Sequence, residues 1–218
     1  MSANILKILG VFAENQKIFT IAAFIAIGFS ANAQQEVKYG PKAGVNFANL
    51  SNTESSKMLT GFYVGGVAEI KFSDKFSVQP ELMYSAQGAK SKYSETFSGL
   101  TVDYKETFKL DYISIPILAK YYIAEGFSVE AGPQFSFLVK SEIKSEGSAL
   151  GVSETEKTDM KDFTNSFDFG IGAGVAYDLA NGFFANARYN FGLTDVWNEN
   201  EGKSVNNGVI QVGVGYKF

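Results

Sequence analysis

The residues of this 218-residue chain that could do chemistry are its carboxylates and its basic side chains, because the sequence contains neither His nor Cys. Without His the usual general base is missing, and without Cys there is no thiolate metal site or disulfide. Eight charged residues stand singly between apolar residues, in positions where small or polar side chains are otherwise found: Lys42, Glu69, Lys71, Glu81, Lys120, Glu130, Asp168 and Arg188. They predict a network of ion pairs, and we expect no catalytic residue, metal site or cofactor.

Two further motifs lead to no active site. The run Gly170-x-Gly172-x-Gly174 resembles a dinucleotide fingerprint, but that fingerprint needs a tight turn before a helix, and these glycines alternate along a strand pattern. The net charge is −4, and no basic stripe runs through the sequence. Nucleic acid is therefore not expected as a partner.

The first 33 residues have the pattern of an export signal. After Lys7 and Lys17 comes the apolar run 18–29, and Ala31-Asn32-Ala33 fits a small-residue cleavage site before Gln34. We predict a signal peptide at 1–33 and a single domain at 34–218. An uncleaved inner-membrane anchor is the alternative, although the run is shorter than the roughly 18 residues of a spanning helix. The long stretch before the apolar run leaves open a start codon nearer Lys17.

Beyond the leader no segment is apolar for long enough to span a membrane as a helix, so an exported membrane protein would need a closed sheet. Eight segments alternate apolar residues with small or polar ones, which is the period of a strand. They are residues 37–48, 60–72, 76–87, 110–123, 127–139, 166–178, 183–193 and 210–218. This pattern predicts an all-β fold, an eight-stranded antiparallel up-and-down transmembrane β-barrel.

The connections alternate in length, as they do in outer-membrane barrels. Tight turns are expected at 73–75, 124–126 and 179–182, and long polar loops at 49–59, 88–109, 140–165 and 194–204. In such barrels the turns are periplasmic and the loops lie outside. The loop 140–165 has four Lys and six acids, a composition typical of a mobile surface segment.

Volume decides which face of the barrel points inward. The interior of an eight-stranded barrel is just wide enough for side chains to fill it, so the many Phe and Tyr of the apolar face must point outward. Tyr63, Met83, Leu118 and Tyr122 are exceptions that fall on the inward face. The eight single charges then share a confined lumen, where they must pair. We predict a plugged lumen; the alternative is a narrow selective passage lined by the same charges.

Two single residues carry separate predictions. Pro116 lies inside a predicted strand and cannot donate a ladder hydrogen bond, so we expect a bulge or kink there. Trp197 lies in the last outer loop or at the membrane rim, where an interfacial anchor is favoured over a ligand-stacking platform.

Several segments resemble a known family. Residues 39–46 (YGPKAGVN), 111–118 (DYISIPIL), 170–175 and 208–218 are similar to the PorT-like outer-membrane β-barrel proteins of the Bacteroidota. The resemblance implies an architecture like that of OmpA and OmpX, and some relatives serve secretion and gliding machinery. The terminal Phe218 resembles the C-terminal targeting signal of outer-membrane proteins, so the barrel-assembly machinery is an expected partner during insertion.

Three classes of function are compatible with these patterns. The first is a non-enzymatic barrel in outer-membrane lipid whose loops contact an extracellular or periplasmic protein. The second is a component of a secretion or gliding apparatus, which differs from the first in its partner. A lipid-facing enzyme is the third class, and it is disfavoured because acyl chemistry generally couples a Ser nucleophile to a His base.

Overall fold

The computed structural model describes residues 36–53, 56–97, 100–149, 152–199 and 202–218. The predicted leader at 1–33 lies outside the described residues. Apart from the first residue of β1, the strands belong to one compact unit, Val37–Phe218. In the described part of the chain no helix has the length and apolar character needed to cross a bilayer.

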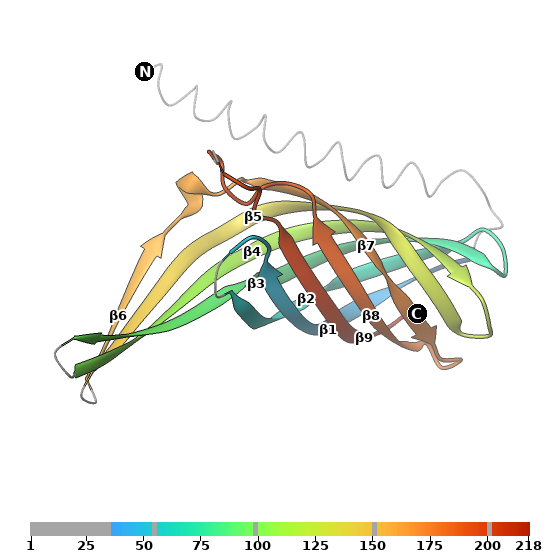
Figure 1. Cartoon of the computed structure of the whole chain (residues 1–218). Coiled ribbons are helices and arrows are strands. Elements are labelled where there is room, and N and C mark those ends of the chain that lie inside the picture. Colours follow the sequence, from blue (N-terminus) through green and yellow to red (C-terminus); the bar gives the residue numbers. More distant parts are fainter. Residues whose placement is uncertain (1–35, 54–55, 98–99, 150–151, 200–201) are drawn as a thin grey trace, which may run out of the picture. The chain divides into compact units, whose positions relative to one another are not determined.

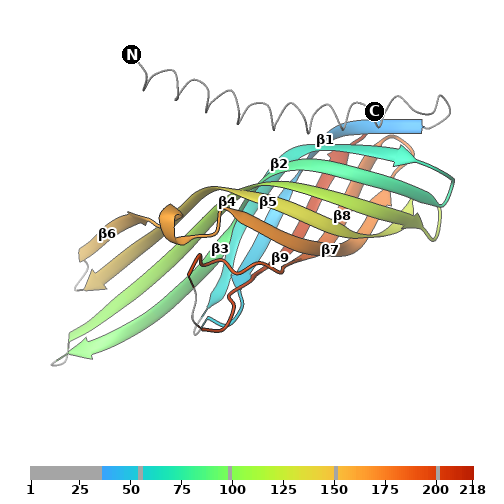
Figure 2. The same ribbon diagram turned by 90° about the horizontal axis from the view of Figure 1, so that it is seen from above.

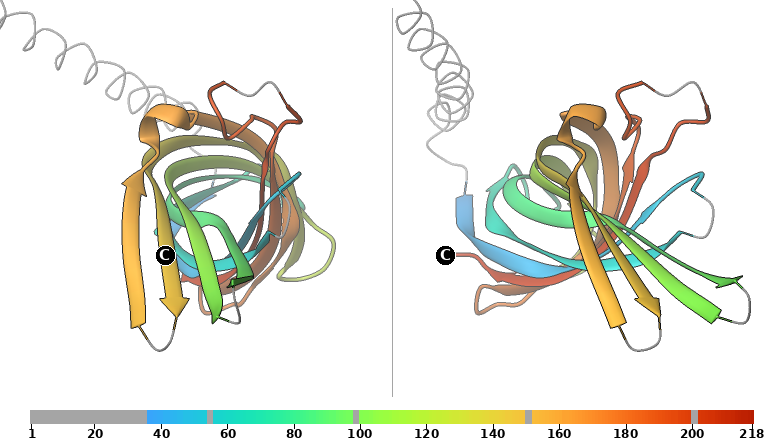
Figure 3. Two further views of the ribbon diagram at one scale, coloured as in Figure 1. Left: turned by 60° about the vertical axis from the view of Figure 1, so that its left-hand side comes forward. Right: turned by 90° about the vertical axis from the view of Figure 1, so that its left-hand side faces the viewer.

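Eight strands close a ring, as the alternation of the sequence predicts. Each strand pairs antiparallel with the next, and β1 pairs with β9 to close the ring. The ring strands are β1 Glu36–Leu50, β2 Lys57–Lys71, β3 Phe76–Phe97, β4 Leu100–Tyr122, β5 Phe127–Ala149, β7 Phe167–Asp178, β8 Phe183–Gly192 and β9 Asn207–Tyr216. Figure 3 shows the closed ring from two sides. β6 (Val152–Asp159) pairs with β5 outside the ring, and a short 3-10 helix, η1 (Lys161–Phe163), follows it.

The two faces of the sheet sort as the volume argument predicts. Along β8 exposed and buried residues alternate without a break, with Ala and aromatic side chains mostly outside and Asn186, Arg188 and Asn190 inside. Ile171 is 51% exposed and Val212 is 45% exposed on the outer surface. Among the inward exceptions, Tyr63 is buried to 2% exposure. The bulky apolar side chains therefore cover the outside of the ring.

The prediction of long loops at 88–109 and 140–165 is wrong over most of their length. β3 and β4 pair in constant register as far as the tip of their hairpin, and β5 continues to Ala149 before β6 returns along it. These segments form a four-stranded projecting sheet of residues 89–97, 100–111, 140–149 and 152–159, which extends past the ends of the other strands (Figures 1 and 2). The period of a strand is present in β4 of this sheet, where Val102, Tyr104 and Phe108 alternate with polar residues, and sequence analysis missed it among the many charged residues.

The bulge expected at Pro116 is also wrong. Pro116 pairs with Gln134 of β5 in the same register that continues beyond it, and the register of β3 with β4 is constant on both sides. A residue of a strand directs its N–H to one neighbour only, so the missing donor affects one ladder and no register shift follows at Pro116. The register shift between β4 and β5 instead lies at Asp111/Tyr112.

Candidate functional site

The centre of the lumen holds two carboxylates and two cations from four strands. Arg188 of β8 donates from both terminal nitrogens to Glu81 of β3, at 2.8 and 3.0 Å, and from Nε to Glu130 of β5 at 2.8 Å. Lys42 of β1 also donates to Glu81, at 3.0 and 3.2 Å. At most 1% of each of these four side chains is exposed. The cluster contains as many positive as negative charges, which is the condition for burying charge in a confined space.

Glycines of β7 make room for this cluster. A Cβ at Gly172 would lie 2.5 Å from the side-chain oxygen of Asn190 and 3.2 Å from Cδ of Arg188. At Gly174 a Cβ would lie 2.8 Å from Cα of Arg188. The glycine run therefore lies in a strand whose small residues admit the large lumen side chains, and it has no phosphate-binding turn.

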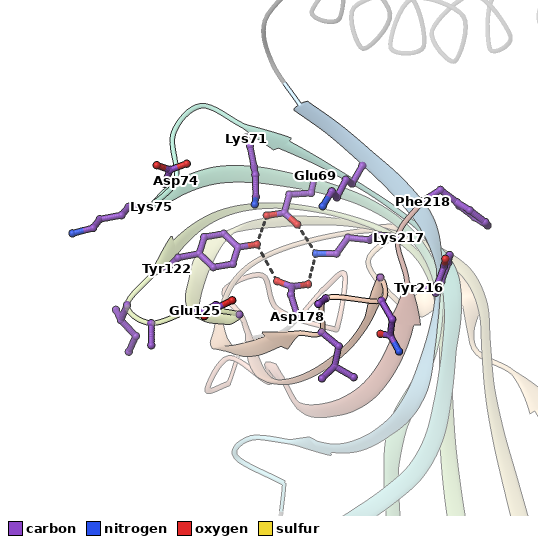
Figure 4. A pocket seen from close by; sticks show the side chains of 18 residues that line it. Glu69, Lys71, Asp74, Lys75, Tyr122, Glu125, Asp178, Tyr216, Lys217 and Phe218 are labelled. Atoms are coloured by element: carbon purple, nitrogen blue, oxygen red, sulfur yellow. Dashed lines mark hydrogen bonds and ion pairs between the residues drawn. The ribbon is translucent and has the colours of Figure 1, made fainter.

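A second ion cluster lies at the short-turn end of the barrel (Figure 4). Lys120 of β4 is 3.0 Å from Asp178 of β7 and 3.6 Å from Glu69 of β2. Lys217, which follows β9, pairs with both of these carboxylates, and the hydroxyl of Tyr122 lies within hydrogen-bonding distance of both and can donate its one proton to either. This cluster is also neutral, with two cations and two carboxylates.

Gln79 connects the two clusters. Its side-chain nitrogen donates to Glu81 at 2.7 Å, and its oxygen accepts from Lys120 at 3.3 Å. One amide thus satisfies a carboxylate of the central cluster and an ammonium of the other, so the ion pairs form a continuous network along the lumen.

The structure brings together six of the eight charged residues singled out in the sequence. Lys71 is half-buried at the short-turn mouth, with its nitrogen 5.3 Å from the ring centre of Tyr122. Asp168 lies further along the lumen, beside Gln134 and Asn207. Neither takes part in the ion pairs between described residues. Sequence reasoning omitted Lys217 and Asp178 from the network, although each falls on the inward face by its alternation.

Towards the long-hairpin end the lumen filling becomes neutral. Asn46 donates to Ser85 at 3.0 Å and accepts from Gln211 at 3.0 Å, and Gln211 in turn accepts from Asn190 at 2.7 Å. The enclosed space beside this layer measures about 10 Å³, which is close to the volume that one water needs. The side chains of this layer therefore leave little free volume at this level of the lumen.

An apolar cluster covers the neutral layer at the long-hairpin end. It consists of Leu50, Ala89, Leu110, Tyr112, Leu138 and Val196, with Phe108 and Val205 packed against it. The ring of Trp197 stacks on Phe108 at 5.2 Å between ring centres. This intramolecular contact gives Trp197 a structural role that sequence analysis missed; its interfacial anchoring stays a prediction.

The short-turn mouth opens into a cavity of about 720 Å³ beside the second ion cluster. Its lining includes charges of both signs, among them Lys38, Lys71, Asp74 and Glu125 (Figure 4). Burial by itself would lower the pKa of Lys217 at this mouth, but the neighbouring carboxylates outweigh it and raise that pKa. Lys217 is therefore a fixed cation at neutral pH.

The projecting sheet has two chemically different faces. The face that continues the lumen side, here called the aromatic–acidic face, carries Tyr93, Tyr104, Glu106, Phe108, Ile143, Glu154 and Glu156. The opposite one carries Lys90, Lys92, Lys105, Lys109, Lys140, Lys144 and Lys157; together with Lys57 of β2, which pairs with Lys90, it is here called the lysine face. Tyr93 and Tyr104 stack across the strands at 5.1 Å between ring centres.

Ion pairs on the lysine face involve two glutamates. Lys105 contacts Glu146 at 2.6 Å, Lys144 also pairs with Glu146, and Lys140 is 3.2 Å from Glu142. Hydrogen bonds from Lys105 and Lys144 lower the pKa of Glu146 to about 2, and a hydrogen bond from Lys140 lowers that of Glu142. Both glutamates are therefore ionised at neutral pH.

These arrangements offer little for catalysis. Within the described ranges no group of three or more metal-ligating residues of the His, Cys, Asp or Glu type is found. The central carboxylates are held by buried cations, so they have no free access to a substrate proton. The lumen chemistry is that of a structural ion network.

Comparison with known proteins agrees with this architecture. A family model described as an outer membrane protein beta-barrel domain matches residues 32–198. The chain belongs to this family. It is therefore an outer-membrane β-barrel protein. No match was found among curated proteins.

Two bacterial proteins are among the solved structures to which the chain is similar. Neisserial surface protein A (NspA) is 16% identical, with a TM-score of 0.50, and the match covers 84% of this chain and 99% of that one. The attachment invasion locus protein Ail of Yersinia pestis is 18% identical, with a TM-score of 0.42, and the match covers 84% of this chain and 99% of that one. At this identity the likeness to NspA concerns the fold alone.

Proposed function

We propose that this protein is a non-enzymatic membrane anchor that holds a stiff, four-stranded sheet outside the cell for contact with another macromolecule. The observation that carries the proposal is the combination of a filled lumen with a projecting sheet paired in register almost to its tips. In this orientation the short turns and the C-terminus face the periplasm, as in other outer-membrane barrels.

The aromatic–acidic face is the proposed contact surface. Tyr93 is 43% exposed on it, and Tyr side chains supply large contact areas at low entropic cost. A hollow of about 400 Å³ next to Tyr104 is lined by Glu106, Glu154 and Glu156. This composition fits a partner with basic and planar groups.

The contact surface is testable by photo-crosslinking in intact cells. A crosslinking amino acid in place of Tyr93 is expected to give adducts of defined mass, whereas the same residue in place of the outward-facing Val212 is expected to give only lipid adducts. In a shortened variant, one Asn-Gly turn replaces residues 91–106 and a second replaces residues 143–158. Each turn joins two residues that already pair, Lys90 with Thr107 and Glu142 with Asp159, so the register of the barrel is kept. If position 93 gives no protein or glycan adduct, the contact role is contradicted.

A plugged lumen is part of the same proposal, with a narrow solute channel as the alternative. Reconstituted into planar bilayers, the protein is expected to give no steady conductance, because the ion network and the neutral layer fill the cross-section. Long-lived channels of uniform size would support the alternative.

A second candidate function is a component of a secretion or gliding apparatus, which the PorT-like segments suggest. The observation that favours it is the cavity of about 720 Å³ at the short-turn mouth, which would be open to periplasmic partners. Crosslinkers at Lys71 and Asp74 would then give periplasmic adducts, and their absence would remove this candidate.

Export is proposed to follow the sequence signals at both ends of the chain. We infer cleavage before Gln34, which N-terminal sequencing of the membrane-inserted protein would test. Phe218 is 68% exposed and its ring lies 6.0 Å from that of Tyr39. Replacing Phe218 by Ala is expected to slow insertion; an unchanged insertion rate would contradict a targeting role.

A further inference from the structure

The charges of the projecting sheet are sorted by face. The eight lysines lie on the lysine face, while Glu106, Glu154 and Glu156 lie on the other one. On the lysine face the described acids are fewer than the lysines: Asp103, Asp111, Glu142, Glu146 and Asp159. The lysine face is therefore a positively charged surface.

This surface places like charges directly opposite each other on neighbouring strands. Lys57 faces Lys90, Lys92 faces Lys105, and Lys144 faces Lys157. Directly opposed like charges destabilise a sheet, because their Cβ atoms are only about 4.5–5.5 Å apart. Three such pairs on one face leave a repulsion that a bound anion would relieve.

Internal acids compensate only part of this charge. Glu146 pairs with Lys105 and Lys144, and Glu142 pairs with Lys140. For Lys57, Lys90, Lys92 and Lys157, no ion pair with an acid is found among the described residues. Lys57, Lys92 and Lys105 also line a hollow of about 770 Å³, which they share with Tyr93, Tyr104 and two acids, Asp103 and Glu146.

The lysine face continues directly from the lipid-facing surface of the barrel. Along β4, alternate residues run from Ile113 on the outer surface through Asp111 and Lys109 to Lys105, and β4 has no extra residue that would switch the face. Successive residues of one face are about 6.6 Å apart along a strand. Lys140, which pairs with Asp111, and Lys109 therefore lie one and two such steps beyond Ile113, at the level of lipid headgroups, and Lys90 and Lys92 lie further out.

We propose that the lysine face binds the phosphorylated headgroup of an anionic glycolipid in the surrounding outer leaflet, whose acyl chains lie against the apolar belt below. Ammonium groups bind phosphate as point charges. The adjoining apolar surface favours a lipid over a soluble anion, because one molecule can contact both surfaces at once. The proposal goes beyond the contact role of the aromatic–acidic face and uses the opposite face of the sheet.

The test measures lipid binding to the full barrel in detergent by native mass spectrometry. The probes are bis-phosphorylated lipid A, dephosphorylated lipid A, and the acyl-free disaccharide bis-phosphate as a competitor. The variant Lys90→Gln/Lys109→Gln/Lys140→Gln, which includes the two lysines nearest the apolar belt, is expected to bind the phosphorylated lipid roughly a hundredfold more weakly, because each lysine near an anionic surface contributes about fivefold. The dephosphorylated lipid is expected to bind both proteins equally weakly.

Matched controls separate a specific surface from net charge. Lys38→Gln/Lys71→Gln/Lys75→Gln removes the same charge at the short-turn mouth and is expected to bind like the wild type; an equal loss would overturn the proposal. Arg in place of the three lysines of the test variant is expected to preserve binding in a barrel shown by heat-modifiable migration to be folded. Loss of binding in the folded Arg variant would also overturn it. Full displacement by the acyl-free disaccharide at equal concentration would identify a soluble anion and overturn the lipid assignment.

Discussion

Arg188 is the residue whose replacement tests the lumen network most directly. Its side chain is fully buried and holds Glu81 and Glu130 through three hydrogen bonds of 2.8 to 3.0 Å. In Arg188→Met, Glu81 keeps Lys42 and Gln79 as partners, whereas Glu130 loses its hydrogen-bonding partner in the ion network. The variant therefore leaves one buried carboxylate without a counter-charge.

The expected cost follows from that uncompensated charge. Removing one partner of a buried ion pair costs about 3 to 5 kcal/mol. We expect the free energy of unfolding to fall by about that amount. Equilibrium urea unfolding of the barrel in short-chain lipid vesicles, followed by far-UV circular dichroism and by the fluorescence of Trp197, measures it.

A double variant supplies the control. Arg188→Met/Glu130→Gln removes one charge of each sign and leaves Lys42 to balance Glu81, so it is expected to recover most of the lost stability. If the single variant loses less than about 1 kcal/mol, the range of solvent-exposed pairs, the lumen charges are hydrated and the plug is refuted. A double variant no more stable than the single one would equally refute the argument from charge balance.

Three further predictions concern the two ends of the barrel. Burial lowers the pKa of Lys217 and the carboxylates of Glu69 and Asp178 raise it, and the net effect is a pKa above the ordinary 10.5. The ion pairs of Lys217 therefore stabilise the fold fully below pH 10.5, and this stabilisation is lost as the pH rises through the raised pKa. The difference in unfolding free energy between wild type and Lys217→Met should therefore shrink in strongly alkaline urea titrations, and a constant difference would contradict the ion-pair role. Leu110→Ala, in the fully buried apolar cluster, should lower the free energy of unfolding by about 2 to 5 kcal/mol in the same assay, and a change within error would show that the cluster is loosely packed. The carboxyl carbon of Glu146 should titrate by NMR with a pKa of about 2 and move towards 4.5 in Lys105→Gln/Lys144→Gln, whereas a wild-type value already near 4.5 would show that these lysines do not hold it.

Much of the barrel wall could be predicted from local alternation. The polar positions Asn186 and Arg188 were placed inside, and Ile171 and Val212 outside, because successive side chains of a strand point to opposite faces whatever the strand pairs with. The same rule placed Lys217 and Asp178 on the inward face, so the information for the second ion cluster was present although these two residues were left out of the predicted network.

Other features could not be read from local pattern. The sequence predicts loops where the projecting sheet lies, because charged and polar residues make up most of 88–109 and 140–165; the strands are held by cross-strand contacts such as Tyr93 on Tyr104. Pro116 was expected to disturb the sheet, but a missing donor affects only the ladder towards which its nitrogen points.

The sequence by itself determined the closed all-β wall and which side chains face its interior, since both depend on the period of two along each strand. Only the tertiary structure decided that Glu81 meets both Lys42 and Arg188, and that Lys217 reaches Glu69 across 148 residues of chain. The physical reason is that these contacts depend on the register and tilt of eight strands at once, and a shift of two residues keeps every face while changing every partner.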